Sequence, residues 1–428
     1  MKKFIRISAF LLCICLLCSL FACGAKEKTL MTLGEKTISL NTYHFLLSRM
    51  KGTMASYGYD VNNSDFWNTI ISSDGTTYND YFCSSVLDQA SKYVIAEYLF
   101  EEKGLKLTDE REKIVDDLMA AQVKKAGSKN ALNSELKGYG INYDMLREIY
   151  LTEARIDMLK DHLYGNTGEL IDKEEKDKYL NENYVAFGQL LVAGYYYVID
   201  TDNFGDQVYY TDEKHTAIAY DKENGHTKKD EYGLLEKDIL GGVVYYNDEG
   251  RIAYDKKNGV LGYAMKDGEK VIEKYDDEKL SKLYTDALKY AEDANGSIED
   301  FKELADIYGS GGTDGDIMYL FSSPGYYAAQ YDAYEYLDKI TKELESMKTG
   351  ECKVVESDFG YHVICKYDIE DGVYDSKEQK DVFSDFYDGL ISYLFERECE
   401  KYTSRVKIDK GVLDEAPDMI SVGTNTQY

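Results

Sequence analysis

A glycine-rich run at residues 309–316, Gly-Ser-Gly-Gly-Thr-Asp-Gly-Asp, has the composition of a phosphate-binding loop. Such loops follow a strand and carry a lysine that reaches the phosphates, while their backbone amides surround the anion. No lysine follows this run in the required place, and no strand-like segment precedes it. We therefore expect no phosphate to bind there.

Cysteine and histidine are the residues that hold zinc, and neither is spaced for it after residue 23. The five histidines form no His-x-x-x-His pair. Cys83, Cys352, Cys365 and Cys399 form no Cys-x-x-Cys pair, and they are too few for a disulfide framework. We therefore expect neither a metal nor a cofactor.

The first residues have the composition of an export signal. Three basic residues lie among the first six, and an apolar run follows at 7–22 that is short for a membrane span of about 20 residues. The run ends in Leu-Phe-Ala-Cys at 20–23, which resembles the lipobox of bacterial lipoproteins. This resemblance implies cleavage before Cys23, lipid on its thiol, and a location on the extracytoplasmic face of the cell membrane. The alternative is an uncleaved anchor in which Cys23 has no role.

The chain is strongly acidic, with 79 Asp and Glu against 50 Lys and Arg and a formal net charge of -29. A surface of this charge repels the phosphate backbone, so we expect no binding to nucleic acid. No second apolar segment approaches the length of a membrane span. The length of 428 residues favours two or three domains.

The elements expected before residue 184 are nearly all helical. A short hairpin at 30–40 precedes a helix capped by Ser39, and Thr108 opens another helix with two acids in its first turn. Apolar residues at spacings of four and five predict a buried helix face over 78–102. Further helices are expected at 129–137, 142–163 and 172–183.

The pattern changes at residues 185–192, which form a strand-like apolar run. An internal repeat then occupies 195–275, where Tyr, Gly, Asp and Lys dominate. Val-Tyr-Tyr at 208–210 returns at 244–246, and a later Asn-Gly pair also returns. Asn-Gly after a Tyr-rich run is a hairpin signal, and two repeats are too few for a free-standing solenoid. We therefore expect a β-hairpin insertion that leans on a host domain.

Helices and strands alternate beyond the repeat. We expect the segment after Ala416 to be disordered. Helices are predicted at 276–294, 297–307 and 376–402, and strands at 352–356, 361–367 and 406–409.

Five short motifs stand in the same order as in parvulin-type peptidyl-prolyl isomerases. They are an opening strand, a helix end, a glycine-rich loop, a Gly-Glu turn and a closing strand. This part of the chain therefore resembles a parvulin domain, and the closing strand matches nearly throughout. The motifs are Gln-Leu-Leu-Val at 189–192, Phe-Lys-Glu-Leu-Ala at 301–305, Gly-Asp-Ile at 315–317, Thr-Gly-Glu at 349–351 and Phe-Gly-Tyr-His-Val-Ile at 359–364.

The flanking segments extend the resemblance. A lipid-anchored start, a helical first part and a long helix after the parvulin unit are similar to the PrsA and SurA group of extracytoplasmic foldases. The resemblance implies an α+β fold, in which a discontinuous helical chaperone domain carries an inserted parvulin-like α/β domain with its own β-hairpin-rich insertion. The parts expected are a signal peptide (1–22), N-terminal helices (23–184), the parvulin-like domain (185–370, with the insertion at 195–275), a returning helix and strand (371–416) and a disordered tail (417–428).

The resemblance also implies which residues form the site. Parvulins place two His, a Cys or Asp, and a Ser or Thr around the prolyl bond. Here His362 matches the second His and Ser357 the hydroxyl residue, while Gln189 replaces the first His. The Cys or Asp is missing from its usual segment, where only Ser310 or Asp314 is available.

The substrate pocket is expected around Ile317 and Leu320, by the same resemblance. Isomerisation needs no covalent step, because the catalyst only has to favour the twisted amide over a barrier of about 18–20 kcal/mol. Gln189 forms hydrogen bonds but does not titrate. We therefore expect weak isomerase activity or none.

A parvulin fold would make Cys352 and Cys365 neighbours on antiparallel strands joined by a tight turn at 357–359. Cysteines that face each other there can reach disulfide distance. The closed loop is short and gains little from a covalent link, so we expect two free thiols.

Three functions fit these observations. The first is a lipid-anchored foldase that binds unfolded, newly exported polypeptides and has weak isomerase activity. The second is a holdase chaperone, in which the parvulin fold only binds. The third is a solute-binding lipoprotein of a transporter, which requires two lobes of alternating strands and helices. The helical first 180 residues argue against the third.

Overall fold

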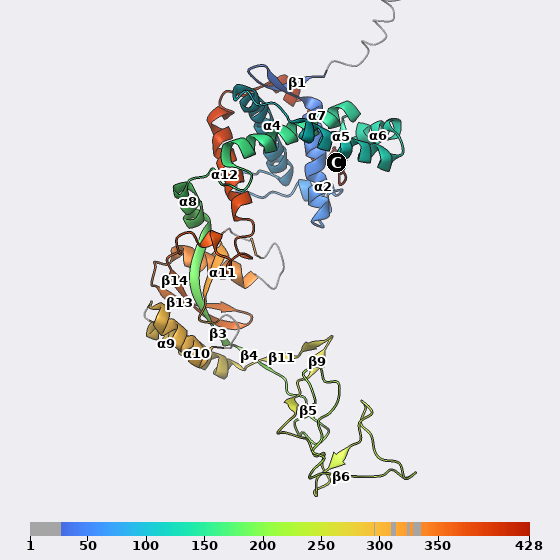
Figure 1. The fold of residues 1–428 in the computed structure, drawn as a ribbon, viewed down its shortest axis with the longest axis vertical. Helices are drawn as coiled ribbons and strands as arrows, with labels where there is room; N and C mark the ends of the chain where they lie inside the picture. Colours follow the sequence, from blue (N-terminus) through green and yellow to red (C-terminus); the bar gives the residue numbers. More distant parts are fainter. Residues whose placement is uncertain (1–26, 295, 310–313, 323–325, 328–334) are drawn as a thin grey trace, which may run out of the picture. The chain divides into compact units, whose positions relative to one another are not determined.

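The computed structural model describes residues 27–294, 296–309, 314–322, 326–327 and 335–428. The chain divides into two compact units (Figure 1): residues 1–176 with 383–428, and residues 177–382. Helices and antiparallel sheets occur together, so the fold belongs to the α+β class expected from the sequence. Within the described ranges, no helix has the length and apolar character that crossing a membrane requires.

The first unit is a set of helices around α4 (Tyr78–Glu102), which packs against α2 (Leu40–Ser56), α7 (Tyr143–Tyr164) and α12 (Phe386–Thr403). A small sheet completes it. In this sheet β1 (Thr29–Leu33) lies between β2 (Lys36–Ser39) and β15 (Lys407–Ile408). Residues 29–39 and 407–408, from the first and last parts of the described chain, thus meet in one sheet. The shorter helices are α3 (Ser64–Trp67), α5 (Asp109–Ala126), α6 (Lys129–Leu136), η1 (Lys137–Tyr139) and α13 (Lys410–Leu413), and α8 (Lys173–Asn183) leads into the second unit.

Local signals explain where the helices of this unit begin. Ser39 and Thr108 cap α2 and α5 with their hydroxyl groups, and Thr77 forms a reciprocal capping box at α4. The helix predicted from residue 376 begins only at Phe386. Buried Phe383 packs edge-on against Phe386, and the chain before them runs in turns and a short η3 (Val373–Asp375).

Residues 417–428, hereafter the docked segment, have neither helix nor strand, yet they are held against the first unit. Met419 and Val422 are 0% and 3% exposed and belong to the unit's hydrophobic core. Figure 1 marks the end of the chain beside α2. The prediction that this segment is disordered is wrong, because its apolar side chains and its backbone both find partners in the folded unit.

The second unit is built on a four-stranded antiparallel sheet with the order β12-β3-β14-β13. Its first strand in sequence, β3 (Tyr184–Ala193), is central, beside β14 (Gly360–Tyr367) and β12 (Ile317–Phe321); β13 (Cys352–Ser357) pairs with β14. Two apolar clusters cover the two faces. Helices α9 (Asp277–Asp293) and α10 (Ile298–Tyr308) contribute to one, and α11 (Glu335–Ser346) contributes to the other.

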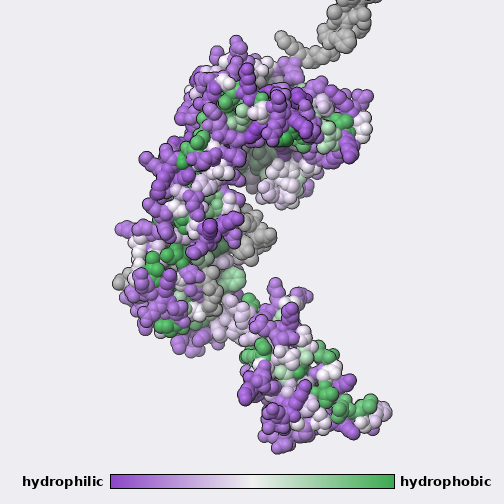
Figure 2. All heavy atoms as spheres, viewed as in Figure 1, coloured by the Kyte–Doolittle hydropathy of each residue, from purple (hydrophilic) through white to green (hydrophobic). Residues whose placement is uncertain are grey.

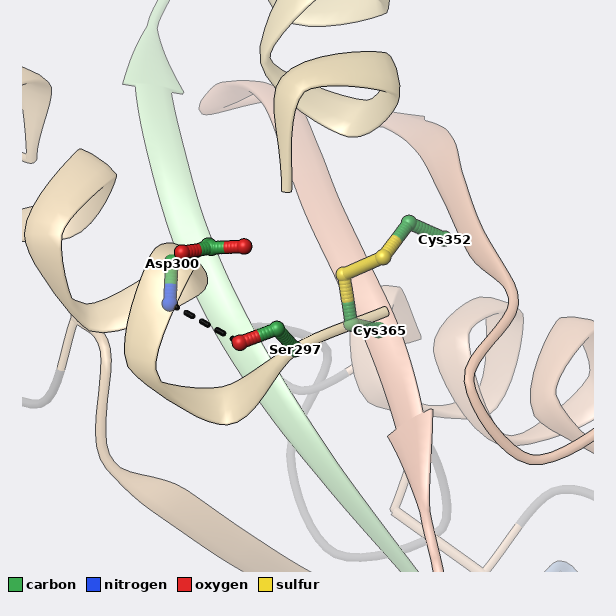
Figure 3. Close-up of a disulfide and its surroundings, with 4 residues drawn as sticks. All are labelled: Ser297, Asp300, Cys352 and Cys365. Atoms are coloured by element: carbon green, nitrogen blue, oxygen red, sulfur yellow. Dashed lines mark hydrogen bonds between the residues drawn. A yellow bond between two sulfur atoms is a disulfide. The ribbon is translucent and has the colours of Figure 1, made fainter. Parts of the chain in front are cut away.

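Cys352 and Cys365 form a disulfide across β13 and β14 (Figure 3). They are direct partners in the strand register, with their Cα atoms 4.1 Å apart. The neighbouring Lys366 N–H donates to the Glu351 carbonyl, so the cysteines occupy a non-hydrogen-bonded pair, where facing side chains are closest. The prediction of two free thiols is wrong, because the strand register brings the two sulfur atoms within bonding distance.

The insertion begins and ends in one antiparallel pair, β4 (Tyr195–Tyr197) with β11 (Ile272–Lys274). Within it, β5 (Tyr209–Tyr210) pairs with β8 (Val260–Leu261), and β7 (Tyr245–Tyr246) pairs with β6 (His226–Thr227). Each repeat therefore pairs its Tyr-Tyr strand with the strand that follows the other repeat. The remaining strands are β9 (Met265–Lys266) and β10 (Glu269–Lys270).

The hydrogen bonds of the two repeats are reciprocal. The Asp221 N–H donates to the Ala253 carbonyl, and the Asp255 N–H donates to the Ala219 carbonyl. The repeats are thus interlocked and related by an internal pseudo-twofold axis. Figure 2 shows apolar residues on the surface of this module, and its exposed side chains include Ile239, which is 99% exposed.

Candidate functional site

His362 lies at the centre of the predicted site, on β14. Its side chain is 2% exposed, and its Nε2 lies 2.8 Å from Ser357 Oγ, at the end of β13. The Phe359 N–H donates to the same hydroxyl at 3.0 Å, across the tight turn between the strands. The turn therefore fixes the serine, and the serine fixes one edge of the imidazole ring.

Burial makes His362 a neutral histidine. Desolvation lowers its pKa from 6.5 to about 4, so the ring is uncharged at neutral pH. Its other nitrogen, Nδ1, is buried and has no hydrogen-bond partner among the described residues. A neutral imidazole has one donor and one acceptor nitrogen. One of its two functional atoms is thus unused in the described structure.

Gln189 lies on the same face of the sheet as His362. It pairs with Ile364, while His362 pairs with Leu191, so the two polar side chains are diagonal neighbours on adjacent strands. Gln189 is 9% exposed, and its Oε1 also has no hydrogen-bond partner in the described ranges. Buried polar atoms without partners are rare and costly. Two of them on one face mark this place as a candidate binding site.

An aromatic wall covers the histidine. The Tyr336 ring stacks on the His362 ring with centroids 5.1 Å apart and planes 10° apart, and Phe359 meets Tyr336 edge-on at 5.6 Å. None of the sequence motifs includes Tyr336. A usable signal was the spacing of four from Tyr336 to Ile340 and Leu344, which places the tyrosine on the buried stripe of α11.

Asp314 lies beside β3, close to this face. Its Oδ1 accepts the Leu191 N–H at 3.1 Å, and the following Gly315 N–H donates to the Gln189 carbonyl at 2.9 Å. Residues 314 and 315 are thus bound to β3 at Leu191 and Gln189. Ser310 and Cys23, which the sequence also singled out, lie outside the described residues.

The two residues expected in the substrate pocket lie on opposite faces of β12. Ile317 pairs with Gly188 and packs in the cluster of α9 and α10, away from His362. It faces away because strand side chains alternate between faces, and its part in a substrate pocket stays a prediction. Leu320 pairs with Val185 and is buried in the α11 cluster, on the face that carries His362. Met318 packs against the same cluster.

The first unit contains a groove of about 920 Å³ between the β1–β2 hairpin, α4 and α7. Apolar atoms of Ile38, Phe100 and Met145 line it, together with an ion pair of 2.7 Å between Arg155 and Glu97. The lining of this groove is therefore partly apolar and partly charged. Over the described part of the chain, no group of three or more His, Cys, Asp or Glu is arranged to hold a metal ion.

No profile of a known protein family matches the chain, and no characterised relative is found by sequence. Among solved structures, the chain is similar to PrsA from Bacillus subtilis at 14% identity and a TM-score of 0.17, over 81% of this chain and 91% of that one. It is also similar to foldase protein PrsA from Streptococcus pneumoniae str. Canada MDR_19A at 10% identity and a TM-score of 0.20, over 91% of this chain and 98% of that one. At these values the functional proposal has to rest on the site itself.

Proposed function

We propose that this protein is a lipid-anchored, extracytoplasmic foldase that binds unfolded, newly exported polypeptides and isomerises X-Pro bonds weakly. The observation that carries the proposal is the pairing of His362 with Gln189 on one sheet face. Each has a buried polar atom without a partner among the described residues, and Ser357 orients the histidine. Two of the parvulin-like motifs, at 189–192 and 359–364, supply Gln189 and His362.

The geometry suits a twisted prolyl amide. A neutral His362 and the Gln189 amide can both exchange hydrogen bonds with a rotating carbonyl, without charge transfer. Tyr336 and Phe359 offer an aromatic surface next to them, on which an apolar Pro ring packs well. Stabilising the twisted amide lowers a barrier of about 18–20 kcal/mol.

The same geometry supports a low rate. His362 is 2% exposed, so a client carbonyl has to displace covering side chains before it reaches the ring. Gln189 adds a hydrogen bond but no titrating group. The second candidate function is a holdase without isomerase activity. It is favoured by the burial of His362 together with the groove between the β1–β2 hairpin, α4 and α7.

The experiment compares His362→Ala with His226→Ala, an exposed histidine of the insertion, as the matched control. Refolding of a Pro-limited client reports isomerase activity, and light scattering of an aggregating client reports chaperone activity. We expect His362→Ala to remove a slow isomerase rate and to leave protection from aggregation within about twofold of the parent. Fast isomerisation that disappears together with protection would show a true enzyme instead.

The anchor is tested separately. Cys23→Ala should release the protein from membranes or leave it unprocessed, because a thiol is required for lipid attachment. Fractionation with a mass measurement of the N-terminal peptide decides this. A Cys23→Ala protein that is cleaved normally and stays on the membrane would contradict the anchor.

A further inference from the structure

The docked segment is bound largely through its backbone. The Lys51 ammonium on α2 donates to the carbonyl oxygens of Ile420 and Val422, each at 3.0 Å. Lys51 is 4% exposed, and desolvation lowers its pKa while the charge of Asp418 opposes that change. A buried lysine that binds two backbone carbonyls recognises the main chain of its partner, whatever side chains that partner carries.

Two backbone N–H groups of the docked segment are also bound. The Met419 N–H donates to Asn79 Oδ1 at 3.0 Å, and the Asn425 N–H donates to the Ser48 carbonyl at 3.0 Å. These contacts come from α2 and α4, on both sides of Lys51 in the fold. Along the docked segment, the first unit thus binds an N–H group, two carbonyls and a second N–H group, which are groups that every polypeptide backbone carries.

Three residues of the docked segment are buried, Met419, Val422 and Asn425. The first two belong to the hydrophobic core, against which Tyr428 also packs. Met419 and Val422 are 0% and 3% exposed, while Ile420 between them is 38% exposed. A turn in which the Val422 N–H donates to the Asp418 carbonyl at 3.1 Å directs both to the same side. The groove thus requires two apolar residues three positions apart, a pattern that is common in unfolded chains.

Gly52 makes room for the docked segment. A Cβ at this position of α2 would lie 1.8 Å from the Asn425 carbonyl oxygen. Glycine weakens a helix interior relative to alanine. At this position its missing Cβ permits another backbone to cross the helix closely.

The fit of the docked segment is incomplete. The side-chain Nδ2 of Asn425 is buried, with Asn425 2% exposed, and finds no hydrogen-bond partner among the described residues. An unpartnered buried amide weakens the association. A segment with a better residue at this place would bind more tightly than the chain's own.

The Tyr139 hydroxyl of η1 also donates to the Thr424 carbonyl at 3.4 Å. From these contacts we propose that the groove of α2, α4 and η1 is a binding site for a short segment of an unfolded polypeptide, and that the docked segment occupies it as an internal competitor. The partner is recognised by its backbone and by two apolar side chains three positions apart. This inference rests on the proposed function, and it names the client site and its regulation. A client binds only the fraction of molecules whose groove is open.

The first experiment uses the unmodified protein. Hydrogen exchange is measured with and without saturating reduced, carboxymethylated α-lactalbumin, which is permanently unfolded. We expect the amides of Met419 and Asn425 to lose protection when this client binds, because the client then occupies their acceptors, Asn79 Oδ1 and the Ser48 carbonyl. Protection that is unchanged at saturation would overturn the proposal.

The second experiment compares Met419→Ala/Val422→Ala with Ile420→Ala as the matched control in the same segment. The double variant should bind the same client at least roughly tenfold more tightly. Its docked segment no longer occupies the groove, so the groove is open in most molecules and the apparent affinity is no longer reduced. The control should bind like the parent. A folded double variant with the parent's affinity would overturn the proposal, and the exchange experiment stands if the variant does not fold.

A synthetic peptide of residues 417–428 completes the test. It should bind the double variant, compete with the client, and lose binding when Gly52→Ala is added. A peptide that does not compete would show a purely structural segment. Failure of the proposed function is a different result, because the parent would then not protect clients from aggregation at all.

Discussion

At the scale of single residues, His362 combines a covering aromatic ring, one hydrogen bond from a turn and one unused nitrogen. Each has a separate cause. The register places its ring on the α11 face, Ser357 ends β13 beside it, and burial keeps it neutral. A buried histidine that stays neutral acts at neutral pH as a hydrogen-bonding group and not as a charged acid.

The neutral state of His362 makes stability depend on pH. Its folded pKa, about 4, lies below the unfolded value of 6.5, so the unfolded chain binds the proton more readily. Stability from this group is therefore complete above pH 6.5 and is lost as the pH falls from 6.5 to 4. The loss should reach about 3 kcal/mol.

Urea unfolding of the parent and of His362→Gln, each at pH 7 and pH 4.5, measures this contribution. The difference between the two proteins isolates His362 from the carboxylates that titrate in the same range. Equal losses of stability in both proteins would contradict a neutral, buried His362.

At the scale of elements, the disulfide ties the two strands that present His362 and Ser357. The link closes a loop with a sequence separation of 13. Removing it with Cys352→Ala/Cys365→Ala should lower the free energy of unfolding by about 3 kcal/mol. Denaturant unfolding of both proteins, with and without reductant, checks this value. Reductant should destabilise the parent and leave the double variant unchanged.

The insertion should be removable as an element. Its base is already an antiparallel pair, β4 with β11. Beside this pair, where the insertion joins the four-stranded sheet, the Tyr275 N–H donates to the Gly194 carbonyl. Replacing residues 198–271 by a short Gly-rich turn should leave a hairpin and an intact sheet, since loop closure costs little. Cooperative unfolding and unchanged exchange protection in β3 and β14 are the measurements. An insoluble or molten product would show that the module belongs to the core.

Elements with strong local signals were predictable, and those set by distant partners were not. Caps and apolar spacing placed α4 and the start of α5 almost to the residue, and the closing-strand motif placed β14. The late start of α12 depends on the packing of Phe383. The disulfide depends on strand register, and the order of the docked segment depends on Lys51 and Gly52, which lie far away in sequence.

The site shows the same division. Gln189 and His362 were found by motif, and the alternation of strand residues puts them on one face. The same alternation removes Ile317 from that face, which the motif alone did not reveal. Tyr336 follows a part of the chain without a family motif, so only its helical spacing pointed inward.

At the scale of the whole molecule, the first unit is completed by residues that follow the second unit in sequence. Arg397 of α12 makes two hydrogen bonds to Glu175, at 2.6 and 3.0 Å, and β15 pairs with β1. Truncation after Asp371 should therefore abolish protection of an aggregating client, because it exposes the core of the first unit. Truncation after Ala416 keeps α12 and β15 and should retain protection. Light scattering and circular dichroism of both truncations decide this, and equal protection by both would contradict it.

The order β12-β3-β14-β13 also determines how long β3 stays unpaired while the chain is synthesised. β3 has eight buried residues among its ten, and it is the first strand of its sheet to be made. Its partners begin at Ile317 and Gly360, so both of its edges wait while more than a hundred residues follow. At about 5–20 residues per second, the wait to the end of β14 is roughly 10–35 s. An apolar strand with two open edges is an aggregation hazard over such a time. A nascent copy of this chain is thus itself a demanding client, and its yield should depend on the chaperones that meet it before its own sheet closes.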